Sequence, residues 1–199
     1  MCRKLIILIS ILFITSNCSK DELAYEIKDQ VDPYKLYEEA YNAFEKGDYF
    51  YADKKFSEAE LNFKTVEFAA KSSIMASYAL YGINFYTEAL ENLERYLKKY
   101  PADTNVKYAH YLIALIYYEQ ISDEKKDLQP LLNADRKIDF FLKEFPESDY
   151  AIDLKFKKDL IQNQLAAKEL YVAKYYISTQ KWVPAINRLK KIIEVYEKT

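Results

Sequence analysis

The feature that most constrains the fold is a pair of short amphipathic segments that meet at a glycine, within residues 36–61. Apolar residues recur at three- and four-residue steps before Gly47, and after it they again lie mostly on one helix face: Leu36, Ala40, Ala43 and Phe44, then Ala52, Phe56, Ala59 and Leu61. Gly47 stands where the first helix must stop, because glycine adopts a left-handed conformation without steric cost. The segment therefore predicts two helices joined by a tight turn.

Small and aromatic residues alternate in this hairpin in a way that resembles the tetratricopeptide (TPR) repeat, a helix–turn–helix unit of about 34 residues. Its small second-helix residue recurs along the chain, at Ala52, Ala89, Ala134 and Ala185. The chain contains only two glycines and five prolines, which also favours helices over β-hairpins. We expect an all-α, TPR-like solenoid of about four units, with boundaries near residues 33–66, 70–101, 105–146 and 150–199.

Asp32-Pro33 is typical of a helix start, with the aspartate as the cap. Residues 150–177 contain neither glycine nor proline and predict one long helix that joins the third unit to the fourth. The sequence stops at Thr199, directly after an apolar stretch and without a polar capping helix. Two interpretations remain open: the sequence is truncated, or a partner covers that end.

The first 17 residues have the character of a signal peptide, with Arg3 and Lys4 followed by a short apolar stretch. Cys18 comes directly after this region, as in bacterial lipoprotein signals, and is the candidate lipidation site. Thr15 and Asn17 depart from the usual residues before such a cysteine, so a secreted protein and an uncleaved anchor stay as alternatives. Residues 18–32 are polar and acidic and are interpreted as a flexible tether.

Few residues offer catalytic or cofactor chemistry. His110 is the single histidine, and we expect it to pack in an apolar helix face. The sequence shows no Cys or His pair with metal-ligand spacing and no phosphate-binding glycine loop. A net charge of −2 gives no broad basic field for nucleic acid. We therefore expect no enzymatic activity, no cofactor, no metal and no nucleic-acid partner.

Aromatic residues are more informative, since the chain contains 20 tyrosines. Many lie on the first helices of the units, which line the concave side of a TPR array. One interpretation is that they bridge neighbouring helix pairs. The other is a groove for an extended, aromatic-rich peptide, with the candidate residues Tyr78, Tyr81, Tyr111 and Tyr117, because tyrosine offers contact area at low entropic cost.

The combination of lipoprotein signal, acidic tether and TPR units resembles the BamD family of lipoproteins of the outer-membrane β-barrel assembly machinery. The resemblance covers roughly residues 18–197 and is most specific in the fourth unit, where AKYY at residues 173–176 precedes WVPAINR at residues 182–188. The second and third units also close similarly, at Tyr100-Pro101 and Phe145-Pro146.

This resemblance implies a non-enzymatic lipoprotein on the periplasmic face of the outer membrane. Implied partners are the POTRA region of a BamA-like barrel protein, other lipoproteins of the complex, and unfolded outer-membrane proteins. Arg188 matches the family arginine that contacts the POTRA region; the alternative is a solvated helix arginine. Residues 63–67 differ from the turn that usually closes the first unit in this family. We therefore assign no substrate-binding residues to that region from the resemblance. The rival function is that of another periplasmic TPR lipoprotein, one that coordinates peptidoglycan enzymes.

Overall fold

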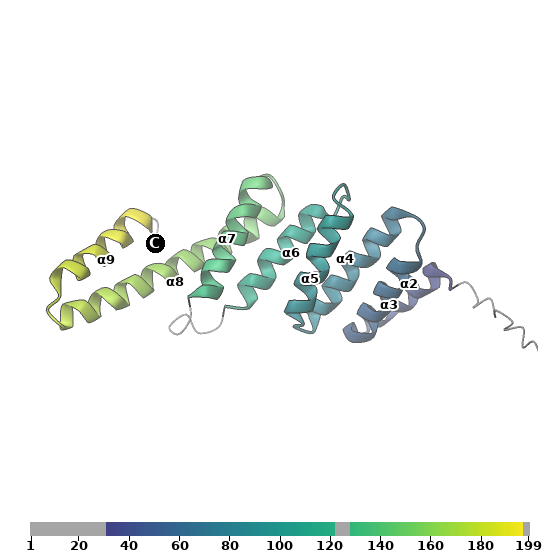
Figure 1. The fold of residues 1–199 in the computed structure, drawn as a ribbon, viewed down its shortest axis with the longest axis horizontal. Coiled ribbons are helices and arrows are strands. Elements are labelled where there is room, and N and C mark those ends of the chain that lie inside the picture. Colours follow the sequence, from purple (N-terminus) through teal and green to yellow (C-terminus); the bar gives the residue numbers. More distant parts are fainter. Residues whose placement is uncertain (1–30, 122–127, 197–199) are drawn as a thin grey trace, which may run out of the picture. The chain divides into compact units, whose positions relative to one another are not determined.

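A computed structural model describes residues 31–121 and 128–196. Cys18, the signal peptide and nearly all of the tether lie outside these residues. The described parts contain eight α-helices and no strands: α2 (Pro33–Glu45), α3 (Tyr49–Asn62), α4 (Val66–Gly82), α5 (Tyr86–Lys99), α6 (Val106–Glu119), α7 (Gln129–Glu144), α8 (Tyr150–Ser178) and α9 (Trp182–Val195). Figure 1 shows them as successive hairpins.

Four helix pairs follow one another in the chain, and each helix packs against the next. First helices also contact each other across pairs, α4 with α6 and α6 with α8. This pattern is that of a TPR-like solenoid and confirms the predicted all-α class. The four repeating alanines are all buried in second helices, where a small side chain permits close packing: Ala52, Ala89, Ala134 and Ala185.

The predicted helix signals are confirmed at the first hairpin. Asp32 caps α2, where its Oδ1 accepts a hydrogen bond from the backbone N–H of Tyr34 at 3.0 Å, and Pro33 is the first helical residue. Gly47 has a φ of +79°. The N–H of Asp48 donates to the carbonyl of Ala43 at 2.9 Å, which completes a Schellman turn.

Two later turns have the same form without glycine. Asn84 and Gln180 have φ values of 61° and 58°, and the residues that follow them donate back to Leu80 and Tyr176. Asparagine tolerates this conformation better than glutamine does, so the turn between α8 and α9 carries more backbone strain. The left-handed conformation of these two residues was not predicted, because neither is a glycine.

The start of α4 differs from the sequence prediction. The second unit was predicted from residue 70, but α4 begins at Val66. Its first half carries small buried residues that face other helices: Ala69, Ala70, Ser72 and Ser73. Buried serines hide the apolar periodicity, so the helix start could not be seen. The long helix is confirmed, since α8 runs unbroken for 29 residues.

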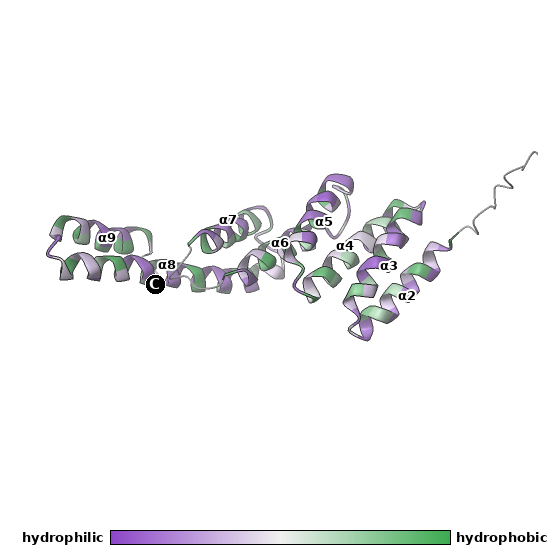
Figure 2. Ribbon diagram, turned by 60° about the horizontal axis from the view of Figure 1, so that its bottom comes forward, coloured by the Kyte–Doolittle hydropathy of each residue, from purple (hydrophilic) through white to green (hydrophobic). Residues whose placement is uncertain are grey.

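Apolar and hydrophilic residues are interspersed along the helices (Figure 2). Among the residues that the structure describes, no helix is both long enough and apolar enough to cross a bilayer.

Candidate functional site

Aromatic rings connect the first helices of all four pairs. Phe44 on α2 lies 5.5 Å from Tyr78 on α4, measured between ring centroids. Tyr78 lies 6.2 Å from Tyr108 on α6, and Tyr108 lies 5.7 Å from Tyr150 at the start of α8. We call these four residues the aromatic ladder. Edge and tilted contacts at such distances favour aromatic pairs beyond the burial of area.

Of the four predicted groove tyrosines, Tyr78 belongs to this ladder, and Tyr81 and Tyr111 stack on its members. Tyr81 stacks on Tyr78 with centroids 6.1 Å apart, and Tyr111 stacks on Tyr150 at 4.6 Å. The hydroxyl of Tyr111 donates to Oδ2 of Asp153 at 3.0 Å, and burial followed by this carboxylate raises the pKa of Tyr111. Tyr78 and Tyr150 remain partly exposed, so the ladder has an accessible surface.

Tyr108 and Tyr150 complete the ladder, although they were not among the predicted groove residues. Tyr108 could have been found, since it lies three residues before Tyr111 and hence on the same helix face. Tyr150 could not, because its place depends on the packing of α8 against α6.

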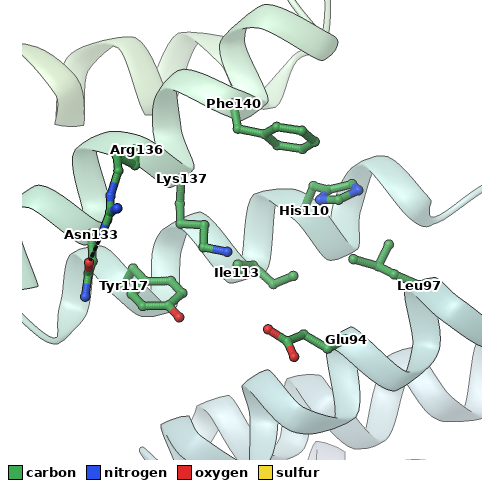
Figure 3. A pocket seen from close by; sticks show the side chains of 9 residues that line it. All are labelled: Glu94, Leu97, His110, Ile113, Tyr117, Asn133, Arg136, Lys137 and Phe140. Carbon is green, nitrogen blue, oxygen red and sulfur yellow. Dashed lines mark hydrogen bonds between the residues drawn. The ribbon is translucent and has the colours of Figure 1, made fainter.

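Tyr117, the fourth predicted groove residue, lies on a different face of α6, together with His110 and Ile113. These residues line a cavity of about 530 Å³ that α5 and α7 complete (Figure 3). The Lys137 ammonium lies 5.3 Å from the centroid of the Tyr117 ring. His110 packs against Phe140 and Phe145 at 5.1 and 5.6 Å, which confirms its expected packing role. Burial first, and then the charge of Lys137, lowers the pKa of His110.

Arg188 lies on α9 and reaches back to α8. Its Nη1 donates to Oε2 of Glu169 at 2.8 Å, while Lys191 Nζ donates to Oε1 of the same carboxylate at 2.5 Å. Burial alone would raise the pKa of Glu169, but Lys191 and Arg188 together lower it. Arg188 also lines a shallow hollow with Tyr176, Pro184, Asn187 and Lys191. A guanidinium has five donors, so this contact leaves part of the fork for other acceptors.

A second carboxylate cluster, centred on Glu60 of α3, was not predicted from the sequence. Arg95 on α5 donates from both terminal nitrogens to the two oxygens of Glu60, each at 2.7 Å. Lys99 and Tyr100 also donate to Glu60, at 3.0 and 2.8 Å. Burial alone would raise the pKa of Glu60, but hydrogen bonds from these three residues lower it to about 2.

Within the described parts of the chain, no group of three or more His, Cys, Asp and Glu side chains is placed to hold a metal ion.

Comparison with known families decides the classification. Residues 29–199 match the YfiO family, described as outer membrane lipoproteins. The chain belongs to this family. The YfiO assignment agrees with the BamD resemblance, because similar curated proteins carry the name "Outer membrane protein assembly factor BamD".

Three of these relatives show the extent of the likeness. The Caulobacter vibrioides protein is 31% identical over 164 residues, which is 82% of this chain and 54% of that protein. The Rickettsia prowazekii protein is 30% identical over 82% of this chain and 65% of its own length. The Neisseria gonorrhoeae protein is 28% identical over 99% of this chain and 79% of its own length. The chain thus spans between about half and four fifths of these relatives.

Proposed function

We propose that this YfiO-family chain is a non-enzymatic scaffold in the assembly of outer-membrane β-barrel proteins. The observation that carries the proposal is the match over residues 29–199, together with relatives named as assembly factors. A stack of helix hairpins suits such a role because it presents extended side-chain surfaces to several partners at once.

Arg188 is proposed to bind a carboxylate on the POTRA region of a BamA-like barrel protein. Its contact with Glu169 orients the guanidinium, and Arg188 lines the hollow beside Asn187. Arginine is favoured at interface hot spots because its planar fork matches a carboxylate.

The partner test is a pull-down of the full chain with the purified barrel protein and its POTRA domains. We expect Arg188→Ala to weaken capture about tenfold or more. Lys191→Ala is the matched control, since Lys191 binds the same carboxylate of Glu169. Equal losses in both variants would show that only the α8–α9 contact matters. Recovery of peptidoglycan enzymes in place of the barrel protein would favour the rival function.

The aromatic ladder, with Tyr81 and Tyr111, is proposed to receive unfolded outer-membrane proteins. Partly exposed rings on successive first helices would accept the alternate apolar side chains of an extended segment. We expect Tyr78→Ala and Tyr111→Ala to weaken binding of a peptide from the last strand of a barrel protein, with helical circular dichroism unchanged. Tyr171→Ala is the control, because this tyrosine is 71% exposed on α8 and makes none of the ladder contacts. Loss of the helical circular dichroism signal in both Tyr78→Ala and Tyr111→Ala would mean that these two tyrosines serve only the fold.

The anchor is proposed to be lipid on Cys18, which would hold the folded units at the periplasmic face of the outer membrane. Mass spectrometry of the membrane-extracted protein should show an acylated N-terminal cysteine. Cys18→Ser should move the protein to the soluble periplasmic fraction. An unmodified Cys18 in membrane-bound protein would refute the lipid anchor and leave the scaffold role standing.

A further inference from the structure

The first two junctions between helix pairs carry different side chains, and a cavity lies at the second one. Counted from the repeating alanines Ala52, Ala89 and Ala134, the position of Glu60 on α3 corresponds to Leu97 on α5. By the same count, Arg95 on α5 corresponds to Phe140 on α7. The bidentate ion pair of the first junction is thus replaced by two apolar side chains at the second.

Leu97 and Phe140 border an open space at the second junction. Leu97 and Phe140 stand on either side of His110 and line the cavity of about 530 Å³ (Figure 3). That volume lies within the usual range for sites that bind small molecules, and it is large enough to admit an apolar side chain. Ile113 is buried in its wall, while Phe140 remains 46% exposed although it is aromatic. The cavity therefore offers apolar surface that an incoming side chain can cover.

Charges of both signs flank this apolar surface. The Glu94 side chain on α5 is exposed, and its carboxylate makes no hydrogen bond or salt bridge within residues 31–121 and 128–196. Lys137 on α7 forms no salt bridge with any described residue, and the Tyr117 ring holds its ammonium in place. Arg136 lies beside it and donates to Oδ1 of Asn133 at 2.5 Å. A partner carboxylate in the cavity would meet the Lys137 ammonium, while the Arg136 guanidinium points toward Asn133 (Figure 3).

We propose that this α5–α6–α7 cavity binds an extended polypeptide segment of a partner protein, in which an apolar side chain lies next to a carboxylate. The apolar side chain enters between Leu97 and Phe140, and the carboxylate pairs with Lys137. A polypeptide is favoured over an anionic lipid because it supplies both a carboxylate for Lys137 and backbone N–H donors for Glu94 on the opposite wall, whereas a lipid phosphate has no donor to offer Glu94. The site is separate from the aromatic ladder and does not depend on it.

The single histidine of the chain makes the site observable, since His110 is in its wall. The test follows the ring signals of ¹³C-labelled His110 by NMR in the full chain in detergent micelles. Three capped probe peptides are titrated at millimolar concentration: Gly-Phe-Glu-Phe-Gly and its matched forms with Gln or Lys in place of Glu. We expect the Glu peptide to shift the His110 signals and to bind about fivefold more tightly than the Gln peptide.

Variants with matched controls decide the outcome. Lys137→Glu should reverse the preference, so that the Lys peptide binds best, and Phe140→Ala should weaken the Glu peptide about tenfold. Phe156→Ala on α8, where the ring is 63% exposed, should leave binding unchanged. Equal binding of the three peptides, or no reversal in Lys137→Glu, would overturn the proposal. Phosphatidylglycerol vesicles that shift His110 more than the Glu peptide would replace it with a lipid site.

Discussion

Two carboxylates in different parts of the chain, Glu60 and Glu169, are buried to a similar degree, at 4% and 8% exposure. Each accepts hydrogen bonds from one arginine and one lysine. They differ in how completely the arginine is used. Arg95 donates to both oxygens of Glu60 and also to Ser73 on α4, whereas Arg188 makes one bond to Glu169.

The two clusters also connect different elements. Glu60 links α3 of the first pair to α5 of the second, so its cluster holds neighbouring repeats together. Glu169 and Arg188 belong to α8 and α9 of the same pair. Of the residues on α9, only Ala185 is buried, while Trp182 and Val183 are exposed. The ionic cluster at Glu60 thus supports the fold. At Glu169, Arg188 uses one hydrogen bond and keeps other N–H donors for a partner.

The largest test of this difference is Arg95→Ala. It leaves the Glu60 carboxylate buried with only Lys99 and Tyr100 as donors, so we expect the free energy of unfolding to fall by about 3 kcal/mol. Urea titration followed by circular dichroism measures the loss. A loss below about 1 kcal/mol would mean that the cluster is not structural.

A double variant separates ionic from packing effects. Glu60→Leu with Arg95→Phe copies the apolar pair that the second junction has at Leu97 and Phe140. Because no unpaired carboxylate remains, we expect it to be more stable than Arg95→Ala. A double variant less stable than the single one would show that the ion pair itself supplies the stability.

Acid should weaken the fold through Glu60. Its folded pKa of about 2 lies below the ordinary value of 4.5, so its stabilisation is complete above the ordinary value and is lost as the pH falls toward 2. The expected loss over this window is about 3 kcal/mol. Thermal unfolding of the wild type and of Glu60→Gln at several pH values measures it. The variant should show a flatter dependence, and a parallel decline in both proteins would assign the acid effect to other carboxylates.

Much of the fold could be predicted because each repeat carries its own local signals. Gly47, the Asp32-Pro33 pair and the repeating alanines report backbone needs that depend on near neighbours in the chain. The start of α4 escaped because buried serines look polar in a sequence, although Ser77 satisfies its hydroxyl with the Ser73 carbonyl one turn earlier.

The candidate sites were predicted only in part, because they depend on contacts between distant residues. The pairing of Glu60 with Arg95 joins positions 35 residues apart, and a charged residue on an amphipathic helix looks like a solvated one. Tyr117 was grouped with the groove tyrosines because it lies on a first helix, whereas the helical period places it on another face of α6 from Tyr111. Arg188 and Cys18 stay predictions of function.

A smaller effect is expected at the second cluster. Arg188→Ala leaves Lys191 on Glu169, and the Arg188 side chain is about two fifths exposed, so we expect a loss of about 1 kcal/mol in the free energy of unfolding. Urea titration beside Lys191→Ala is the measurement. A loss as large as that of Arg95→Ala would contradict the difference between the two clusters, since Arg188 would then contribute as much to the stability of the fold as Arg95.

The smallest expected effects concern two turns, the one at Gly47 in the first helix pair and the one at Gln180 in the last pair. Gly47 has a φ of +79°, and no atom lies within 4 Å of an added Cβ, so Gly47→Ala should destabilise the first pair by about 1 kcal/mol through backbone strain alone.

Gln180→Gly relieves the backbone strain of the turn between α8 and α9 and should stabilise the last pair by about 0.5 kcal/mol. Amide hydrogen exchange on α9 would report it, as slower exchange than in the wild type. Asn84→Gly is the comparison variant and should gain nothing, because asparagine already tolerates the left-handed conformation and its Oδ1 accepts a hydrogen bond from the Tyr86 hydroxyl at 2.8 Å. If Gln180→Gly leaves exchange on α9 unchanged while Gly47→Ala destabilises as expected, then backbone strain at the Gln180 turn does not limit the stability of the last pair.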